Sequence, residues 1–374
     1  MTRIIYVGMD VHKENYTVCC YNQETDMILN AQTLPADYMM IVKYIAGVRA
    51  GFERSGETNV TFKCGYEAGC LGYSLYHQLS NSGLECEILA PSTMASIDNK
   101  RVKTDKRDAA NIAKCLAFGT YRPVYIPTAE DESVKQFIRM RDDAKRMLKA
   151  TKQQILAFLL RHGQIFDQAT HWTKTHIRWL RAIRMGGVLQ ETLQEYMTTF
   201  DYMTDKLERF DIRIEELAQG ATYFEKVKKL SCLIGVKTHT ALSVIVEIGD
   251  FARFANPQKL AAYLGLVPGE HSSGAKQVRT GITKAGNVHV RRLLVEAAQG
   301  YTRGAIGYKS ITIKRRQQGN PPEIIAYADK ANERLRRKYY RMTLQKGKKS
   351  NVAKTAIARE LICFMWGLMT NRIA

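Results

Sequence analysis

The first 120 residues combine short apolar runs with two helical patterns. Four segments are short, apolar and rich in β-branched or aromatic residues, which predicts strands: Arg3–Met9, Tyr16–Tyr21, Val60–Cys64 and Glu85–Leu89. Apolar residues then recur at helical spacing in Gly72–Ser80 and in Asp105–Leu116. Early strands followed by alternating strands and helices predict a mixed sheet covered by helices.

Between residues 130 and 225 the pattern becomes that of long helices with little glycine. Apolar residues there follow a 4-3-4-3 spacing over about four heptads: Leu189, Leu193, Tyr196, Phe200, Met203, Leu207, Phe210, Ile214 and Leu217. This spacing predicts a coiled-coil seam, with an upstream helix (Val134, Ile138, Leu148, Ile155, Leu159) as its partner. Such a stripe is first of all a packing surface, and whether it also serves oligomerisation stays open at this point.

A third pattern starts near Val227. Leu230–Gly249 has the pattern of a helix, a glycine-containing turn and a second helix, whose N-terminus would offer backbone N–H groups to a phosphate. Lys309–Lys354 is crowded with Lys and Arg and carries interleaved tyrosines, which favours contact with a phosphate backbone over a merely solvated face.

The charge balance indicates which kind of molecule the protein binds. Lys and Arg total 56 against 36 Asp and Glu, a formal net charge of +20, which favours a polyanion over an anionic membrane surface. We expect no signal peptide, because no N-terminal stretch has that pattern, and no apolar run approaches the roughly 20 residues that a membrane span needs. None of the 8 cysteines forms a CxxC pair, so we expect free thiols, no zinc and a cytoplasmic location.

Four carboxylates stand where a metal site needs them. Asp10 closes the first apolar strand and Glu67 ends another, a costly position for an acid that has no cation partner. Asp105 and Asp108 are three residues apart, so a helix would place both on one face of its first turn. Taken alone, that pair would more commonly serve as a helix cap and a first-turn acid.

The four acids together predict a site of the RNase H/RuvC-like type for Mg²⁺ or Mn²⁺, because such ions prefer oxygen ligands. Two ions about 4 Å apart can clamp the attacking and leaving oxygens of a phosphodiester. Three cations beside the acid pair would hold the phosphates of a nucleic acid: Lys103, Lys106 and Arg107.

These residues also carry a family resemblance. The chain resembles transposases of the insertion-sequence family one-ten, relatives of the Piv-type DNA invertases that are described as bridge-RNA-guided recombinases. The resemblance lies in Gly8–Lys13, Tyr66–Gly69 and Lys103–Ala109, and then in Phe254–Pro268, His271–Gly274 and Gly281–Arg292. The matching segments cover nearly the whole chain in the same order, with the predicted coiled coil between the two blocks.

The resemblance implies an acid set of the DEDD type, here Asp10, Glu67, Asp105 and Asp108, and a serine that becomes covalently linked to DNA. Ser273 fits best, directly before a glycine and five residues after Pro268, and Ser272 is the alternative. From the residues alone, the pair of serines would more simply be a polar turn. Cations nearby would bind nucleic acid: Lys276, Arg279, Lys284, Arg291 and Arg292.

We therefore expect an α/β plus α protein. Its domains would be a RuvC-like DEDD domain (1–125), a coiled-coil helical hairpin (126–226), and a mostly helical serine domain with a helix-hairpin-helix-like segment (227–374). The leading hypothesis is a Mg²⁺-dependent DNA transposase that uses a serine–DNA intermediate. The resemblance further implies a structured guide RNA and a homodimer that assembles to a tetramer. The rivals are a metal-dependent nuclease or junction resolvase that uses water, and a non-catalytic nucleic-acid-binding protein.

Overall fold

The computed structural model describes residues 2–69, 71–95, 104–168, 170–273 and 276–373, and within 271–279 it describes the backbone alone. Two compact units make up the chain, Met1–Ile126 and Pro127–Ala374.

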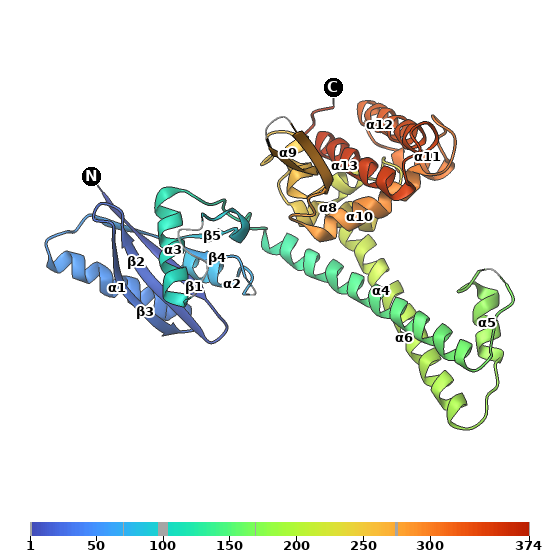
Figure 1. The fold of residues 1–374 in the computed structure, drawn as a ribbon, viewed down its shortest axis with the longest axis horizontal. Helices are drawn as coiled ribbons and strands as arrows, with labels where there is room; N and C mark the ends of the chain where they lie inside the picture. The colour runs from blue at the N-terminus through green and yellow to red at the C-terminus, as the bar shows by residue number, and fades with distance from the viewer. Residues whose placement is uncertain (1, 70, 96–103, 169, 274–275, 374) are drawn as a thin grey trace. The chain divides into compact units, whose positions relative to one another are not determined.

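A five-stranded mixed sheet forms the first unit, in the order β3-β2-β1-β4-β5 (Figure 1). Its strands are β1 (Arg3–Val11), β2 (Asn15–Asn22), β3 (Met27–Pro35), β4 (Val60–Glu67) and β5 (Glu85–Leu89). β1 pairs antiparallel with β2 and parallel with β4, β2 pairs antiparallel with β3, and β4 pairs parallel with β5. The predicted mixed sheet is confirmed, and each of its four predicted strands is present.

Helices cover both faces of this sheet. They are α1 (Tyr38–Arg54), α2 (Ser74–Asn81), the short 3-10 turn η1 (Pro91–Thr93) and α3 (Asp105–Phe118). One face packs its apolar side chains under α1 and α2, as Ile5 and Val7 do with Ile41 and Leu75. α3 covers the opposite face, where Ala109 packs against Cys19 and Tyr21.

The edge strand β3 was not predicted from the sequence. Most of its residues are exposed and only Leu34 is buried, so the strand lacks the apolar alternation that marks a half-buried strand. Its pairing partner β2, in contrast, is buried along almost its whole length.

Most of the second unit is helical. Its elements are α4 (Ala129–Arg161), α5 (Lys174–Ala182), α6 (Val188–Ala218), α7 (Phe224–Leu230), α8 (Thr238–Ile248), α9 (Pro257–Tyr263), β6 (Pro268–Ser273), β7 (Lys276–Ile282), α10 (Val288–Ala298), η2 (Gln299–Tyr301), α11 (Ile311–Gln317), α12 (Pro322–Tyr340), η3 (Arg341–Gln345) and α13 (Ser350–Met369). β6 and β7 form an antiparallel hairpin that the sequence did not predict.

The long helices α4 and α6 lie side by side (Figure 1). Leu148 and Ile155 of α4 share a buried cluster with Leu193, Phe200 and Leu207 of α6. An apolar stripe at this spacing therefore does pack one helix on the other. Its use as an oligomerising coiled coil, and the domain boundaries 126–226 and 227–374, stay predictions.

The helix–turn–helix expected at Leu230–Gly249 begins earlier than predicted. Leu230 is the last residue of α7, the turn follows it, and α8 begins at Thr238. Gly235 in this turn has a positive φ of 79°, and a Cβ there would overlap the backbone of Ala297 in α10. Glycine is required at this close approach.

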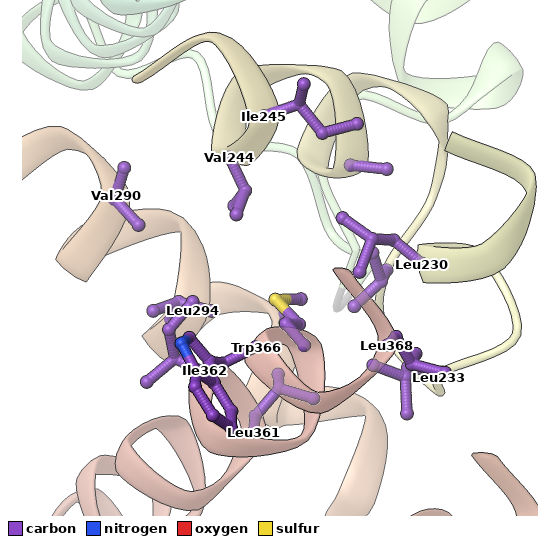
Figure 2. Close-up of a cluster of buried hydrophobic side chains, with 14 of the residues drawn as sticks. Leu230, Leu233, Val244, Ile245, Val290, Leu294, Leu361, Ile362, Trp366 and Leu368 are labelled. Carbon is purple, nitrogen blue, oxygen red and sulfur yellow. The ribbon is translucent and has the colours of Figure 1, made fainter. Parts of the chain in front are cut away.

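The core of the second unit forms around α13. Figure 2 shows Leu361, Ile362 and Trp366 of this helix beside Leu294 of α10, and all four belong to one buried cluster. The indole N–H of Trp366 also donates to the carbonyl oxygens of Phe251 and Phe254, 3.1 and 3.2 Å away. None of the described helices has the length and apolar character that a membrane crossing requires.

Candidate metal centre

Asp10 lies near the carboxyl end of β1, on the face of the sheet that α3 covers. Side chains alternate along a strand, so Val7 and Met9 enter the core under α1 and α2 while Gly8 and Asp10 face the other way. The Asp10 side chain is 17% exposed. The fold therefore holds this carboxylate partly out of water at the sheet surface.

Two glycines allow α3 to approach this surface closely. A Cβ at Gly8 would overlap the carbonyl oxygen of Ala109 and the backbone nitrogen of Ala113, both in α3. A Cβ at Gly65 in β4 would lie 2.9 Å from the side chain of Leu116. Glycine on these neighbouring strands thus determines how close the helix lies to the strand that carries Asp10.

The first turn of α3 supplies the other two aspartates. Thr104 caps the helix, because its side-chain oxygen accepts a hydrogen bond from the backbone N–H of Arg107. Asp105 and Asp108 follow within that turn, three residues apart on one face. Both acids also interact favourably with the helix dipole at this end.

The structure brings Asp10, His12 and Asp105 together. One ligand atom from each of these side chains lies within 4.8 Å of the other two. His12 Nε2 is 3.3 Å from Asp10 Oδ2, and the His12 side chain is 55% exposed. Two carboxylates and an imidazole within this distance are close enough to share one cation.

Burial and neighbouring charges both act on the Asp10 carboxyl. Burial raises the pKa of the Asp10 carboxyl; His12 opposes this, and the negative charges of Asp108 and Asp105 raise the pKa further. A divalent cation among these acids would remove the repulsion and supply the charge that the partly buried carboxylate lacks. The described side chains of this site therefore fit a divalent cation.

Glu67 ends β4, the strand that runs parallel to β1. Met9 pairs with Tyr66, so Asp10 and Glu67 each follow that pair by one residue on neighbouring strands. The Glu67 side chain is exposed and does not belong to the three-residue group around Asp10. Its place beside Asp10 on the sheet is compatible with a role as a ligand, which stays a prediction.

His12 was missed by the sequence reasoning. The signal was its spacing, because a residue two positions after Asp10 in an extended segment lies on the same face. No local pattern, however, indicates that the hairpin turn after β1 keeps His12 beside the acids.

Ser273 lies at the end of β6, where the register pairs it with Lys276 of β7. Ser272 precedes it in the same strand and pairs with Gln277. Both serines therefore belong to a β-hairpin, and Gly274, which follows them, lies outside the described residues. The choice between the two serines stays a prediction.

The base of this hairpin is held by Arg291. One of its guanidinium nitrogens donates to the carbonyl oxygens of Leu264, before β6, and Ala285, after β7, each at 2.8 Å. The Arg291 side chain is buried, so in this structure it serves the protein backbone. Its predicted contact with nucleic acid stays a prediction.

The other predicted cations occupy varied places. Lys106, Arg107 and Lys284 are exposed, and Arg292 is half-buried. Lys103 lies outside the described residues. Lys276 and Arg279 lie on β7, beside the strand that carries the serines.

A second group of charges was not predicted, although one of its members, Arg292, was expected to bind nucleic acid. The Asp142 side chain, 5% exposed on α4, has oxygens 3.2 Å from His239 Nε2 and 3.3 Å from His289 Nε2. Arg141 and Arg292 pair with the same carboxylate. Burial opposes ionisation of Asp142, but His239, Arg292 and His289 hold its pKa well below the usual range.

Comparison with known proteins identifies the family. Residues 227–305 match the family described as Transposase IS116/IS110/IS902 family. Residues 7–163 match the family described as Transposase, the DEDD type of IS110 elements. The first match contains the hairpin with Ser272 and Ser273, and the second contains all four predicted acids.

Relatives match over nearly the whole chain. A Sinorhizobium fredii protein named "Putative transposase y4qE" is 36% identical over 369 residues, which cover 98% of this chain and 88% of the relative. The transposase for insertion sequence element IS1533 of Leptospira borgpetersenii is 31% identical over 343 residues, 91% of this chain and 96% of the relative.

A more distant similarity is to a protein named for gene inversion. The pilin gene-inverting protein of Moraxella bovis is 24% identical over 180 residues, 46% of this chain and 45% of the relative. Together these matches favour strand transfer over simple hydrolysis by a nuclease. The chain belongs to the IS110 family of transposases, DNA-cleaving and strand-transferring enzymes whose DEDD domain implies dependence on a divalent metal.

Proposed function

We propose that this transposase cuts and rejoins DNA through a covalent link to Ser273, assisted by a Mg²⁺ or Mn²⁺ centre at Asp10, Glu67, Asp105 and Asp108. The observation that carries the proposal is the convergence of Asp10 and Asp105 within 4.8 Å, on a sheet face that glycines open to α3. Such a grouping of acids raises the free energy of the folded protein unless a cation neutralises it.

In the proposed reaction, Ser273 Oγ attacks a phosphorus atom of the DNA backbone. An Oγ–P bond forms as the bond from phosphorus to one deoxyribose oxygen breaks, and the hydroxyl proton passes to that oxygen. Attack by a deoxyribose hydroxyl of another strand then joins the DNA and restores the serine. Because the serine link conserves the phosphodiester energy, rejoining needs no other source of energy.

The remaining groups would hold the substrate and balance charge. When bound, the cation supplies Lewis-acid stabilisation of the extra negative charge on the reacting phosphate. The carboxylates of the four acids would hold that ion. Lys276 and Arg279, on the strand beside the serines, would bind the backbone phosphates on either side of the reacting one.

We further propose a structured guide RNA and a dimer that assembles to a tetramer. The net charge of +20 supports binding of more than one nucleic-acid chain. Strand exchange needs at least two active serines, which supports a homo-oligomer, and the packed helices α4 and α6 are the predicted site of its contacts. Sequencing of RNA that co-purifies with the protein, and its mass in solution, would test these two points.

The test of the chemistry is a covalent adduct. The protein is incubated with Mg²⁺, co-purified RNA and DNA that carries the ends of the element, and protein–DNA adducts are separated on a denaturing gel. We expect an adduct with the unaltered protein and with Ser272→Ala, and none with Ser273→Ala. Asp10→Asn and Asp105→Asn should abolish the adduct as well.

Other outcomes would replace parts of the proposal. An adduct that survives Ser273→Ala but is lost with Ser272→Ala would identify Ser272 as the nucleophile. Cleavage without an adduct would mean that water attacks, as in a RuvC-like nuclease. Binding of DNA without cleavage under all these conditions would indicate a protein with a decayed site.

A further inference from the structure

His12 is the member of the acid group that differs in chemistry from the others. It follows β1 directly, and its Nε2 lies 3.3 Å from Asp10 Oδ2. Its imidazole also lies within 4.8 Å of an Asp105 carboxylate oxygen. This proximity to both aspartates places a nitrogen donor within reach of a cation that they would share.

The fold keeps His12 in this place through its backbone. The His12 N–H donates to the carbonyl oxygen of Asn15 at 3.0 Å, which closes the turn between β1 and β2. The pairing of Val11 with Tyr16 continues the hairpin on the strand side of that turn. His12 therefore belongs to the same hairpin as Asp10.

Exposure leaves the imidazole free to adjust. The His12 side chain is 55% exposed whereas that of Asp10 is 17% exposed. A small rotation of the ring could bring Nε2 to a bonding distance from an ion, at little cost in packing.

We propose that His12 is a direct ligand of the metal centre and that it shifts the centre's preference from Mg²⁺ towards Mn²⁺. Mg²⁺ takes oxygen ligands and keeps much of its water, and nitrogen donors favour first-row transition ions. A site with two carboxylates and one imidazole suits Mn²⁺ better than a site of carboxylates alone. The inference rests on the metal centre of the proposed function.

The experiment uses Mn²⁺ as the probe and the full chain. Pulsed electron paramagnetic resonance detects the nitrogen nucleus of an imidazole that binds Mn²⁺ directly. We expect this nitrogen signal in the unaltered protein, its loss in His12→Ala, and its retention in His77→Ala, a matched histidine of the same unit on α2. Thermal unfolding of each variant checks that the fold is kept.

Affinity gives a second readout. We expect His12→Ala to weaken Mn²⁺ binding at least about tenfold, as loss of groups around a metal site commonly does. Its Mg²⁺ affinity should change by less than about threefold, because Mg²⁺ gains little from a nitrogen ligand. His12→Asp, which replaces nitrogen by oxygen, should restore Mn²⁺ binding without the nitrogen signal and should raise Mg²⁺ affinity.

A metal centre that does not use His12 and a protein without any metal centre would give different results. Mn²⁺ that binds without a nitrogen signal, and is lost in Asp10→Asn, would overturn the role of His12 and leave the carboxylate centre standing. Mn²⁺ binding that persists unchanged in Asp10→Asn would overturn both. So would an unaltered protein that binds no Mn²⁺, with or without duplex DNA.

Discussion

A single buried carboxylate, Asp142, joins three helices of the second unit. It lies on α4, and its partners His239 and His289 lie on α8 and α10. Arg292 of α10 and Arg141 of α4 pair with the same group. A buried charge is tolerated only when it is paired in this way, and removing one partner leaves the others facing each other without compensation.

Asp142→Ala should therefore lower the free energy of unfolding by about 3–5 kcal/mol, the usual cost of breaking a buried ion pair. Its neighbour offers a matched control. The Asp143 side chain is 52% exposed and pairs with Arg146 one turn further along the helix, so Asp143→Ala should change stability by less than about 1 kcal/mol. Urea unfolding of the two variants measures the difference, and equal losses would contradict the role given to Asp142.

Two residues of the same type can have different bonding partners, and the sequence alone does not distinguish them. Arg291 and Arg292 are adjacent in a basic segment, yet Arg291 is bonded to backbone carbonyls and Arg292 to a carboxylate. Asp142 lies four residues after the buried Ile138, which marks an acid on an apolar face. Its partners His239, His289 and Arg292, however, come from segments 97 or more residues away. Contacts at such separations depend on the tertiary fold and leave no local pattern.

At the scale of elements, apolar patterns predicted best those strands and helices that bury apolar side chains. β1, β2, β4 and β5 were found because each buries apolar side chains, whereas β3 exposes most of its residues. The hairpin of β6 and β7 is short and polar at its end, so it resembled a turn. Helices with a clear apolar face, such as α3, were predicted within about two residues of their ends.

The contact of α3 with β1 depends on Gly8. Gly8→Ala should force the helix away from the sheet, lower the free energy of unfolding by about 1–3 kcal/mol, and weaken Mn²⁺ binding by displacing Asp105 from Asp10. Gly47 is the matched control, because it lies in the interior of α1 with open space around it.

Gly47→Ala should stabilise the protein by about 0.5–1 kcal/mol through helix propensity and leave Mn²⁺ binding unchanged. Thermal unfolding and Mn²⁺ titration of both variants provide the measurements. Unchanged Mn²⁺ binding in Gly8→Ala would mean that the position of α3 does not control the proposed centre.

At the scale of the whole molecule, stability should depend on pH through His289. Burial lowers the pKa of this histidine, and Arg292 and Arg139 add to the shift, while Glu247 and Asp142 oppose it. The folded protein therefore binds a proton less readily here than the unfolded chain, whose histidine has a pKa of about 6.5. This contribution is complete above pH 6.5 or so and is lost as the pH falls towards the lowered value.

We expect the free energy of unfolding to fall between pH 7.5 and pH 5, and His289→Asn to reduce that slope. The pKa of His176 is also lowered by burial, so His176→Asn gives the slope that belongs to this second histidine. Urea unfolding at several pH values measures both. A slope unchanged by His289→Asn would show that its protonation is not linked to folding.

The charge of the whole molecule, 56 basic against 36 acidic residues, should make DNA binding depend steeply on salt. Each phosphate contact made by Lys or Arg adds about −0.9 to the slope of log K against log salt concentration for duplex DNA.

Three exposed lysines between α12 and α13 belong to the basic segment predicted to contact phosphates: Lys346, Lys348 and Lys349. Replacing all three by Gln should reduce the magnitude of the slope by about 1–3. Replacing them by Arg keeps the charge and should keep the slope. Fluorescence anisotropy from 50 to 200 mM salt measures the DNA affinity and therefore the slope of each variant. Equal slopes for the Gln and Arg variants would mean that DNA phosphates bind elsewhere on the protein.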